Sequence, residues 1–237
     1  MQKTIVISDL HLCDNSSAND FKKTDLLLQF FEEFRDEKIV LDGDIFECLQ
    51  APLEKIVFYN SEVVRAIINL KDKEILWGNH DHAFRKVFQE TYVSGGIFIH
   101  HGHQFDIYNK DPGFIGAKVA EIIGWFERVI HHDTDEWLKG IAEYARRITP
   151  VDSEYLGDLS EYRDGAEYIL KNIEDINLVI MGHTHSPSLK RVKGGLYLNV
   201  GAWTSDVEFA TYGCITDETV ELLTYPDKKV ISQARRI

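Results

Sequence analysis

Seven side chains that can bind a metal ion occur in short clusters along the chain. They offer carboxylate, imidazole and amide oxygen ligands and no thiolate, and they are Asp9, His11, Asp44, Asn79, His101, His183 and His185. Such mixed ligation suits Mn, Fe, Zn and similar cations rather than an iron–sulfur cluster or an all-oxygen calcium site. Seven ligands exceed the needs of one ion, so the set predicts two ions that share a bridging carboxylate. In two-metal hydrolases the ions lie roughly 3.5–4 Å apart, and a hydroxide held by both would be the nucleophile of an in-line displacement.

Each cluster has a simpler interpretation when it is taken alone. Asp9 and His11 could be a capping residue and a surface histidine, and Gly43-Asp44 is a common turn. The segments 78–81 (Gly-Asn-His-Asp) and 182–185 (Gly-His-Thr-His) are stronger signals, because each follows a run of apolar residues. The presence of all these clusters in one chain, in this order, favours a metal centre over coincidence.

The clusters follow five predicted strands, at residues 4–7, 39–41, 75–77, 97–99 and 178–181. Ligands in open α/β sheets bind beyond the carboxyl ends of strands, so segments that are distant in sequence can converge there. Helices are predicted at 24–35 and 52–70, a further strand at 196–200, and a hairpin at 212–216 and 219–225. Residues 112–175 have a predominantly helical pattern and no clear strand.

Composition restricts the class of protein. A chain of 237 residues suits a single domain, residues 1–237, with a helical insertion at about 112–175. The net charge of −13 and the lack of a basic stripe disfavour a long nucleic acid as the substrate. No apolar run is long enough to span a bilayer and no signal-like N-terminus is present, so we expect a cytoplasmic protein. Three cysteines without a CxxC pattern predict free thiols.

The ordered motifs resemble those of the calcineurin-like metallophosphoesterases. The resemblance covers residues 4–201, except for the helical stretch between 105 and 175, and it is carried by Asp9-x-His11, Gly43-Asp44, the segments 78–81 and 182–185, and His101-Gly102-His103. It implies a four-layer αββα sandwich of two mixed sheets flanked by helices, with a two-metal site at its rim. It also implies hydrolysis of a phosphate ester or pyrophosphate bond.

The resemblance also assigns a role to each motif residue. Asp9, His11 and His185 would hold the first ion, and Asn79, His101 and His183 the second, with Asp44 as the bridge. His80 would protonate the leaving-group oxygen or steady the phosphoryl oxygens, and Asp81 would orient His80. Of the divalent transition metals, we expect Mn, while Fe, Zn, Co and Ni are compatible with the same ligands.

The form Gly43-Asp44-x-Phe46-Glu47 is similar to one subgroup, the UDP-2,3-diacylglucosamine hydrolases of lipid A synthesis. These enzymes split a pyrophosphate and carry a helical lid for acyl chains, and residues 112–149 could form such a lid. We favour the alternative that these apolar stripes pack against the main domain. The subgroup carries Arg where this chain has His80. A non-catalytic metal-binding scaffold is a further alternative, which the complete ligand set disfavours.

We expect the partner to be a small phosphorylated molecule, with nucleotides and nucleotide-lipids both open, as is contact with a membrane surface. The oligomeric state is not predicted. Among the remaining histidines, we expect His100 in the core and His131 and His132 on a solvated surface, while His103 could face the substrate or support the ligands. Trp203 could shield the site or belong to the core.

Overall fold

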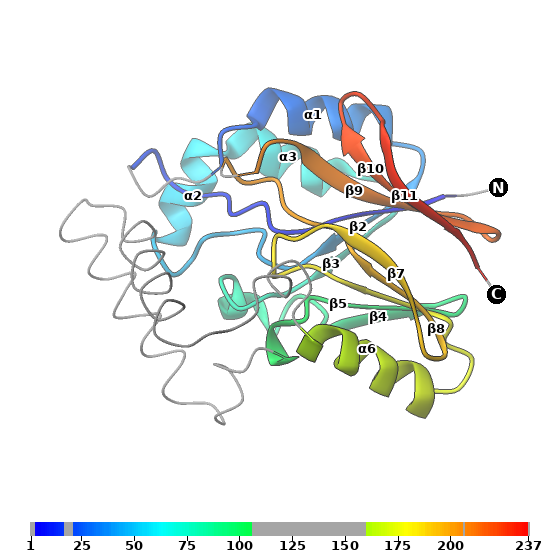
Figure 1. Ribbon diagram of the computed structural model, residues 1–237. Helices are drawn as coiled ribbons and strands as arrows, with labels where there is room; N and C mark the ends of the chain where they lie inside the picture. Colours follow the sequence, from blue (N-terminus) through cyan, green and yellow to red (C-terminus); the bar gives the residue numbers. More distant parts are fainter. Residues whose placement is uncertain (1–2, 17–20, 106–159, 206, 237) are drawn as a thin grey trace, which may run out of the picture.

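The computed structural model describes residues 3–16, 21–105, 160–205 and 207–236. The described elements form four layers, with helices on the outer face of each of two stacked sheets (Figure 1). Both sheets contain parallel and antiparallel pairs. The predicted αββα arrangement of two mixed sheets is therefore confirmed.

The first sheet has six strands in the order β11-β10-β9-β1-β2-β3. Its parallel half consists of β1 (Thr4–Ile7), β2 (Lys38–Asp42) and β3 (Lys73–Leu76). Its antiparallel half consists of β9 (Ala210–Ile215), β10 (Thr219–Tyr225) and β11 (Val230–Arg235). The helices α1 (Thr24–Glu33), α2 (Leu53–Tyr59) and α3 (Ser61–Asn69) contribute to the helical layer on this side.

The second sheet has five strands in the order β4-β5-β6-β8-β7. These are β4 (Thr91–Ser94), β5 (Ile97–His100), β6 (Leu178–Met181), β7 (Ser188–Val192) and β8 (Gly195–Asn199). The helix α6 (Ser160–Asn172) covers the outer face of this sheet. Two short 3₁₀ helices are η1 (His82–Phe84) and η2 (His103–Phe105).

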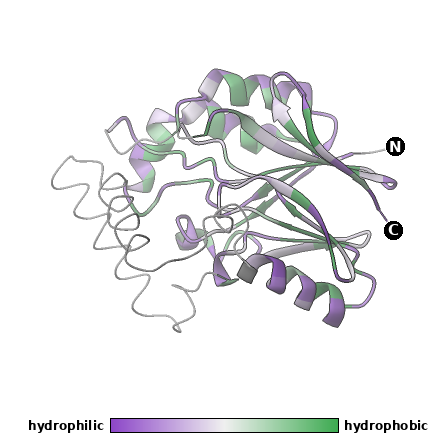
Figure 2. Cartoon of the chain, in the orientation of Figure 1, coloured by the Kyte–Doolittle hydropathy of each residue, from purple (hydrophilic) through white to green (hydrophobic). Residues whose placement is uncertain are grey.

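Three buried apolar clusters fill the spaces between the four layers. Successive strand residues point to opposite faces, so Ile5 and Ile7 pack toward the α1 side while Val6 packs between the sheets. On α1, Leu27, Phe30 and Phe31 share one face at helical spacing and are buried in the first cluster. Figure 2 shows the alternation of hydrophobic and hydrophilic residues along α1 and α6 that this one-sided burial requires.

The structure differs from the sequence-based assignments at the helix over 52–70 and at the edges of the sheets. The helix is divided into α2 and α3 at Asn60, whose side-chain amide donates to the carbonyl oxygens of Cys13 and Ile56. The strands β4, β7 and β11 were not predicted. All three lie at sheet edges, where partly exposed residues weaken the apolar pattern.

The predicted helical insertion overlaps the described residues only at its end, where α6 is helical as expected. The rest of the insertion, with His131, His132 and the proposed lid, lies outside the described residues. The three cysteines are free thiols. Among the described residues, no helix combines the length and the apolar character required to cross a membrane.

Candidate two-metal active site

The predicted ligands lie in loops that follow the central strands of both sheets. In the first sheet, Asp9 and His11 follow β1, Asp44 follows β2 and Asn79 follows β3; in the second sheet, His101 follows β5, and His183 and His185 follow β6. Strands β1, β2 and β3 are parallel neighbours, as are β5 and β6, so the loops of each sheet leave from one edge. The fold thereby brings both sets of loops together.

These loops have an unusual backbone conformation. Among the described residues, seven non-glycine residues have a positive φ, and five of them are predicted ligands: Asp9, His11, Asp44, His183 and His185. Such a conformation costs of the order of 1–3 kcal/mol per residue and persists where the surroundings enforce it, most often at functional sites. The strain therefore coincides with the predicted metal centre.

Two glycines permit the close approach of the loops. A Cβ atom on Gly78 would overlap the carboxylate of Asp44, and one on Gly182 would overlap Ser8 and Asp9. Glycine has no side chain at these points, so the loop after β3 can pack against Asp44 and the loop after β6 against Asp9.

Asp9, His11 and His185 form the first ligand group. The Nε2 atom of His185 lies 3.3 Å from Oδ1 of Asp9, and Nε2 of His11 lies 3.7 Å from the same oxygen. One potential ligand atom from each residue lies within 4.8 Å of the others. Atoms this close can contact a single ion.

Asp44, His101 and His183 form the second group, which meets the same distance criterion. Nε2 of His101 lies 3.1 Å from Oδ2 of Asp44, and the same oxygen lies 3.8 Å from Nε2 of His11 in the first group. Asp44 is therefore positioned between the two groups, as a bridging ligand must be. Asn79 precedes His80, whose backbone N–H donates to Oδ1 of Asp44.

Several of the predicted ligands also make hydrogen bonds to protein through a second side-chain atom. Nδ1 of His101 lies 2.7 Å from the carbonyl oxygen of Asp42, to which it donates, and Oδ2 of Asp9 accepts the backbone N–H of His183. A hydrogen bond at Nδ1 leaves Nε2 as the metal-binding atom of the ring.

The atoms that face the shared space lack such partners. Of the buried side-chain atoms in the described residues that make no hydrogen bond, four belong to predicted ligands: Oδ1 of Asp9, Nε2 of His11, Oδ1 of Asn79 and Nε2 of His101. Buried polar atoms are almost always satisfied in native proteins, so each exception calls for an explanation. Divalent cations would satisfy all four, and the donor set fits a two-metal centre.

Electrostatics in the protein without metal reflect the same convergence. Burial lowers the pKa of His101, but the charges of Asp44 and Asp9 outweigh it and raise this pKa to about 10. Burial also opposes ionisation of Asp44, yet His101 and His80 hold its pKa well below the ordinary value. The carboxylates are therefore charged, and they favour positive charge in the space between them.

His80 contacts Glu47, a residue that the sequence suggested only as a mark of a subgroup. Nδ1 of His80 lies 2.6 Å from Oε2 of Glu47, and the same oxygen lies 2.8 Å from Nδ1 of His11. Burial opposes ionisation of Glu47, but the charges of His80 and His11 prevail and lower its pKa to about 2. Burial lowers the pKa of His80, whereas Glu47 and Asp44 outweigh it and raise this pKa. One buried carboxylate thus links a predicted metal ligand to the predicted proton donor.

Asp81 has a different place from the one expected. Its two carboxylate oxygens accept the backbone N–H groups of Gly78, at 2.5 Å, and Ile45, at 2.8 Å. Both oxygens are thus used to join the loops after β3 and β2. These contacts favour Glu47 over Asp81 as the residue that would orient His80, while Asp81 joins the loops that carry Asn79 and Asp44. A signal for Glu47 exists in the sequence, since it is an acid three residues after Asp44.

Other candidates lie behind the site. His100 is buried, as predicted, and burial together with the charge of His101 lowers its pKa to about 4. His103 is also buried, with a pKa lowered to about 2 by burial and by His101, and its ring packs 4.9 Å from Trp77. Its position beside His101 favours the supporting role over contact with substrate.

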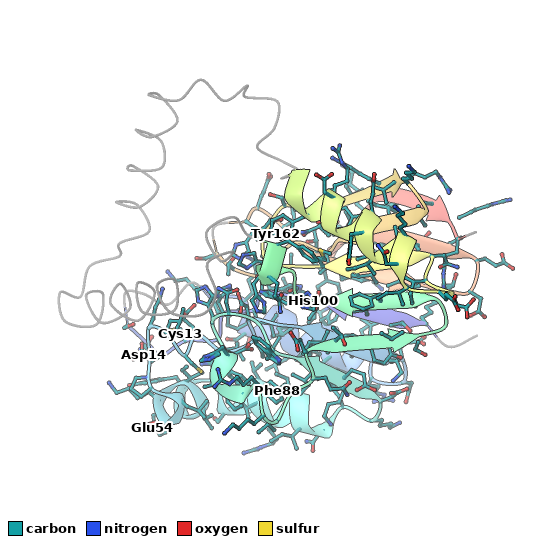
Figure 3. The ribbon with its side chains drawn as sticks, turned by 90° about the horizontal axis from the view of Figure 1, so that it is seen from below. Cys13, Asp14, Glu54, Phe88, His100 and Tyr162 are labelled. Atoms are coloured by element: carbon teal, nitrogen blue, oxygen red, sulfur yellow. The ribbon has the colours of Figure 1, made fainter. Side chains whose placement is uncertain are left out.

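Tyr162 lies near the site, whereas Trp203 does not. Figure 3 labels His100 near the end of β5 and Tyr162 at the start of α6, and the Tyr162 ring lies 6.0 Å from that of His183. Trp203 belongs to the core, since it is fully buried and its indole N–H donates to the carbonyl oxygen of Thr211.

Comparison with known proteins gives a consistent assignment. No curated protein matches the chain. A single-mutant form of Vps29 from Entamoeba histolytica is 18% identical, with a TM-score of 0.50 and coverage of 100% of both chains. Yfce, a phosphoesterase from E. coli, is 14% identical, again with a TM-score of 0.50 and 100% coverage of both chains. These similarities concern the fold. The family model described as the calcineurin-like phosphoesterase superfamily domain matches residues 2–219, and the chain therefore belongs to this superfamily.

Proposed function

We propose that the chain is a metal-dependent phosphoesterase with two divalent transition-metal ions. The observation that carries this proposal is the convergence of two ligand groups on one carboxylate, Asp44, with buried ligand atoms that lack other partners. Asp9, His11 and His185 would hold the first ion and Asn79, His101 and His183 the second. When bound, the ions supply positive charge that activates a water molecule and stabilises the phosphoryl oxygens. Mn is the metal that we expect.

His80 supplies the proton in this proposal. Its Nδ1 faces Glu47, so Nε2 is the atom that can donate to the leaving-group oxygen. The neighbouring carboxylates favour the protonated ring, which is the form that a general acid requires. The proton passes from Nε2 to the leaving oxygen as its bond to phosphorus breaks, and Glu47 compensates the charge of the ring before transfer.

The chemistry of the site is compatible with several classes of phosphoester substrate. A phosphomonoester, a phosphodiester and a pyrophosphate all need an activated water molecule, and an alkyl ester also needs a proton on its leaving oxygen. A UDP-2,3-diacylglucosamine pyrophosphatase is a second candidate, supported by Glu47, which belongs to the subgroup pattern and lies within the site. His80, at the position of an Arg in that subgroup, weighs against it.

An activity panel on purified, Mn-loaded protein separates these functions. The substrates are p-nitrophenyl phosphate, bis-p-nitrophenyl phosphate and UDP-2,3-diacylglucosamine, with Asp44→Asn as the control for contaminating activity. We expect Mn-dependent hydrolysis that this variant lacks. Preference for the lipid nucleotide would support the second candidate. Metal binding without hydrolysis of any phosphoester would refute the enzymatic proposal and support a non-catalytic scaffold.

A further inference from the structure

Asn199 lies at the end of β8, beside the loop that carries two of the predicted ligands. Strands β6 and β8 are parallel, and Met181 is paired with Asn199 in their register. The Gly182–His185 loop starts at this point, so the side chain of Asn199 is adjacent to it. Asn199 is almost completely buried, with an exposed fraction of 1%.

The carboxamide of Asn199 makes three hydrogen bonds. Its Nδ2 donates to the carbonyl oxygen of Gly182, at 2.8 Å, and to the hydroxyl oxygen of Thr184, at 3.0 Å. Its Oδ1 accepts the backbone N–H of Gly201 at 2.9 Å. The orientation of the amide is determined by these partners, because a carbonyl can only accept and a backbone N–H can only donate.

The loop held in this way is strained and carries one ligand for each ion. His183 and His185 both have a positive φ, which non-glycine residues adopt only where neighbouring groups enforce it. The contacts of Asn199 lie immediately before His183 and between the two histidines. His183 belongs to the ligand group of Asp44, and His185 to that of Asp9.

We propose that Asn199 is a positioning residue for the metal centre, which holds His183 and His185 in place for both ions at once. The inference rests on the proposed two-metal function. It goes beyond that function because Asn199 would itself bind neither metal nor substrate. Loss of its hydrogen bonds would release the strained loop, and both ions would then bind more weakly.

The test is Mn²⁺ affinity by competition with a chelator, together with thermal unfolding with and without Mn²⁺. We expect Asn199→Ala to bind Mn²⁺ about 10- to 100-fold more weakly, the range found for outer partners of metal ligands. The rise in Tm on addition of Mn²⁺ should shrink accordingly. Thr184→Val, which removes one of the three partners, should give a smaller loss of affinity in the same direction.

Leu222→Ala is the matched control for a structural effect. Leu222 is fully buried between the sheets, so its truncation should lower the Tm of the metal-free protein and leave Mn²⁺ affinity unchanged. If Asn199→Ala lowers the metal-free Tm but keeps wild-type affinity, the inference is overturned. If that variant does not fold, Thr184→Val decides, and unchanged affinity there overturns the inference too.

Failure of the proposed enzyme can be told apart from failure of this inference. Wild-type protein that binds Mn²⁺ without turnover would refute the proposed phosphoesterase activity. The ratio of Mn²⁺ affinities of Asn199→Ala and wild type would still test the positioning role of Asn199. Wild-type protein that binds no Mn²⁺ would overturn both.

Discussion

Replacing Glu47 with Gln removes one negative charge from a buried position and nearly preserves the shape of the side chain. Oε2 of Glu47 lies 2.6 Å from Nδ1 of His80 and 2.8 Å from Nδ1 of His11. Hydrogen bonds to charged groups contribute about 1.5–3 kcal/mol, and we take the close ion pair between Glu47 and His80 to be of the same order. At about 1.4 kcal/mol for each factor of ten in rate, its loss should slow turnover about 10- to 100-fold.

This effect should depend on the leaving group. An alkyl phosphoester needs a proton on its leaving oxygen, whereas p-nitrophenolate leaves readily as an anion. Glu47→Gln should therefore slow hydrolysis of the alkyl ester much more than that of the p-nitrophenyl ester. Saturating Mn²⁺ is needed in both assays, because Glu47 also contacts His11 and its loss is expected to weaken metal binding.

The pH dependence has a defined sign. In the wild type, Glu47 and Asp44 outweigh burial and raise the pKa of His80, so the protonated ring persists to higher pH. Without the charge of Glu47, that pKa falls, and the decline of the rate at high pH should begin at lower pH. Glu218→Gln, at an exposed turn, is the charge-matched control and should behave like the wild type. The proposed action of Glu47 on His80 would be refuted if both substrates lost the same factor in rate. It would also be refuted if the decline of the rate at high pH stayed at the wild-type pH.

Four other changes test the site. Asp44→Asn should abolish activity and reduce metal content, and an active variant with two bound ions would refute the bridge. His80→Ala should keep its metals and slow turnover roughly 10²–10⁴-fold, and an unchanged rate with a poor leaving group would exclude its role. Gly78→Ala should bind less metal, because the new Cβ atom overlaps the carboxylate of Asp44. A wild-type metal content in this variant would contradict this prediction. Mn²⁺ affinity should fall as pH falls, because a ring nitrogen must be deprotonated to bind and Asp44 and Asp9 outweigh burial to raise the pKa of His101 to about 10. Calorimetry in buffers of different ionisation enthalpy should detect the released protons, and binding without proton release would contradict this.

Much of the fold was predictable because the central strands are short apolar runs with a polar cluster at their carboxyl ends. The strand at 178–181 matches β6 at both ends, for example, and Thr4–Ile7 matches β1. The edge strands β4, β7 and β11 were missed because an edge is partly exposed and its sequence lacks a continuous apolar signal. The break at Asn60 was missed because it depends on a contact with the distant carbonyl oxygen of Cys13.

The sequence predicted that the candidate side chains would lie close together, but only part of their contacts. Ligand types and their positions after strands led to the seven candidates, six of which fall into two close groups while Asn79 offers a buried, unsatisfied oxygen. The partner of His80 was assigned to Asp81, its neighbour in sequence. In the structure Glu47 contacts His80 instead, because the loops after β1, β2 and β3 meet beside Glu47. The sequence shows an acid three residues after Asp44, but it does not show which side chain of another loop this acid meets.

The most direct test of the account is electron paramagnetic resonance of the protein titrated with Mn²⁺. Two ions that share Asp44 should lie roughly 3.5–4 Å apart and couple magnetically. At two Mn²⁺ per chain we expect the spectrum of a spin-coupled pair, and we expect Asp44→Asn to lose it. Saturation at one Mn²⁺ per chain, or two ions with independent spectra, would contradict the two-metal centre.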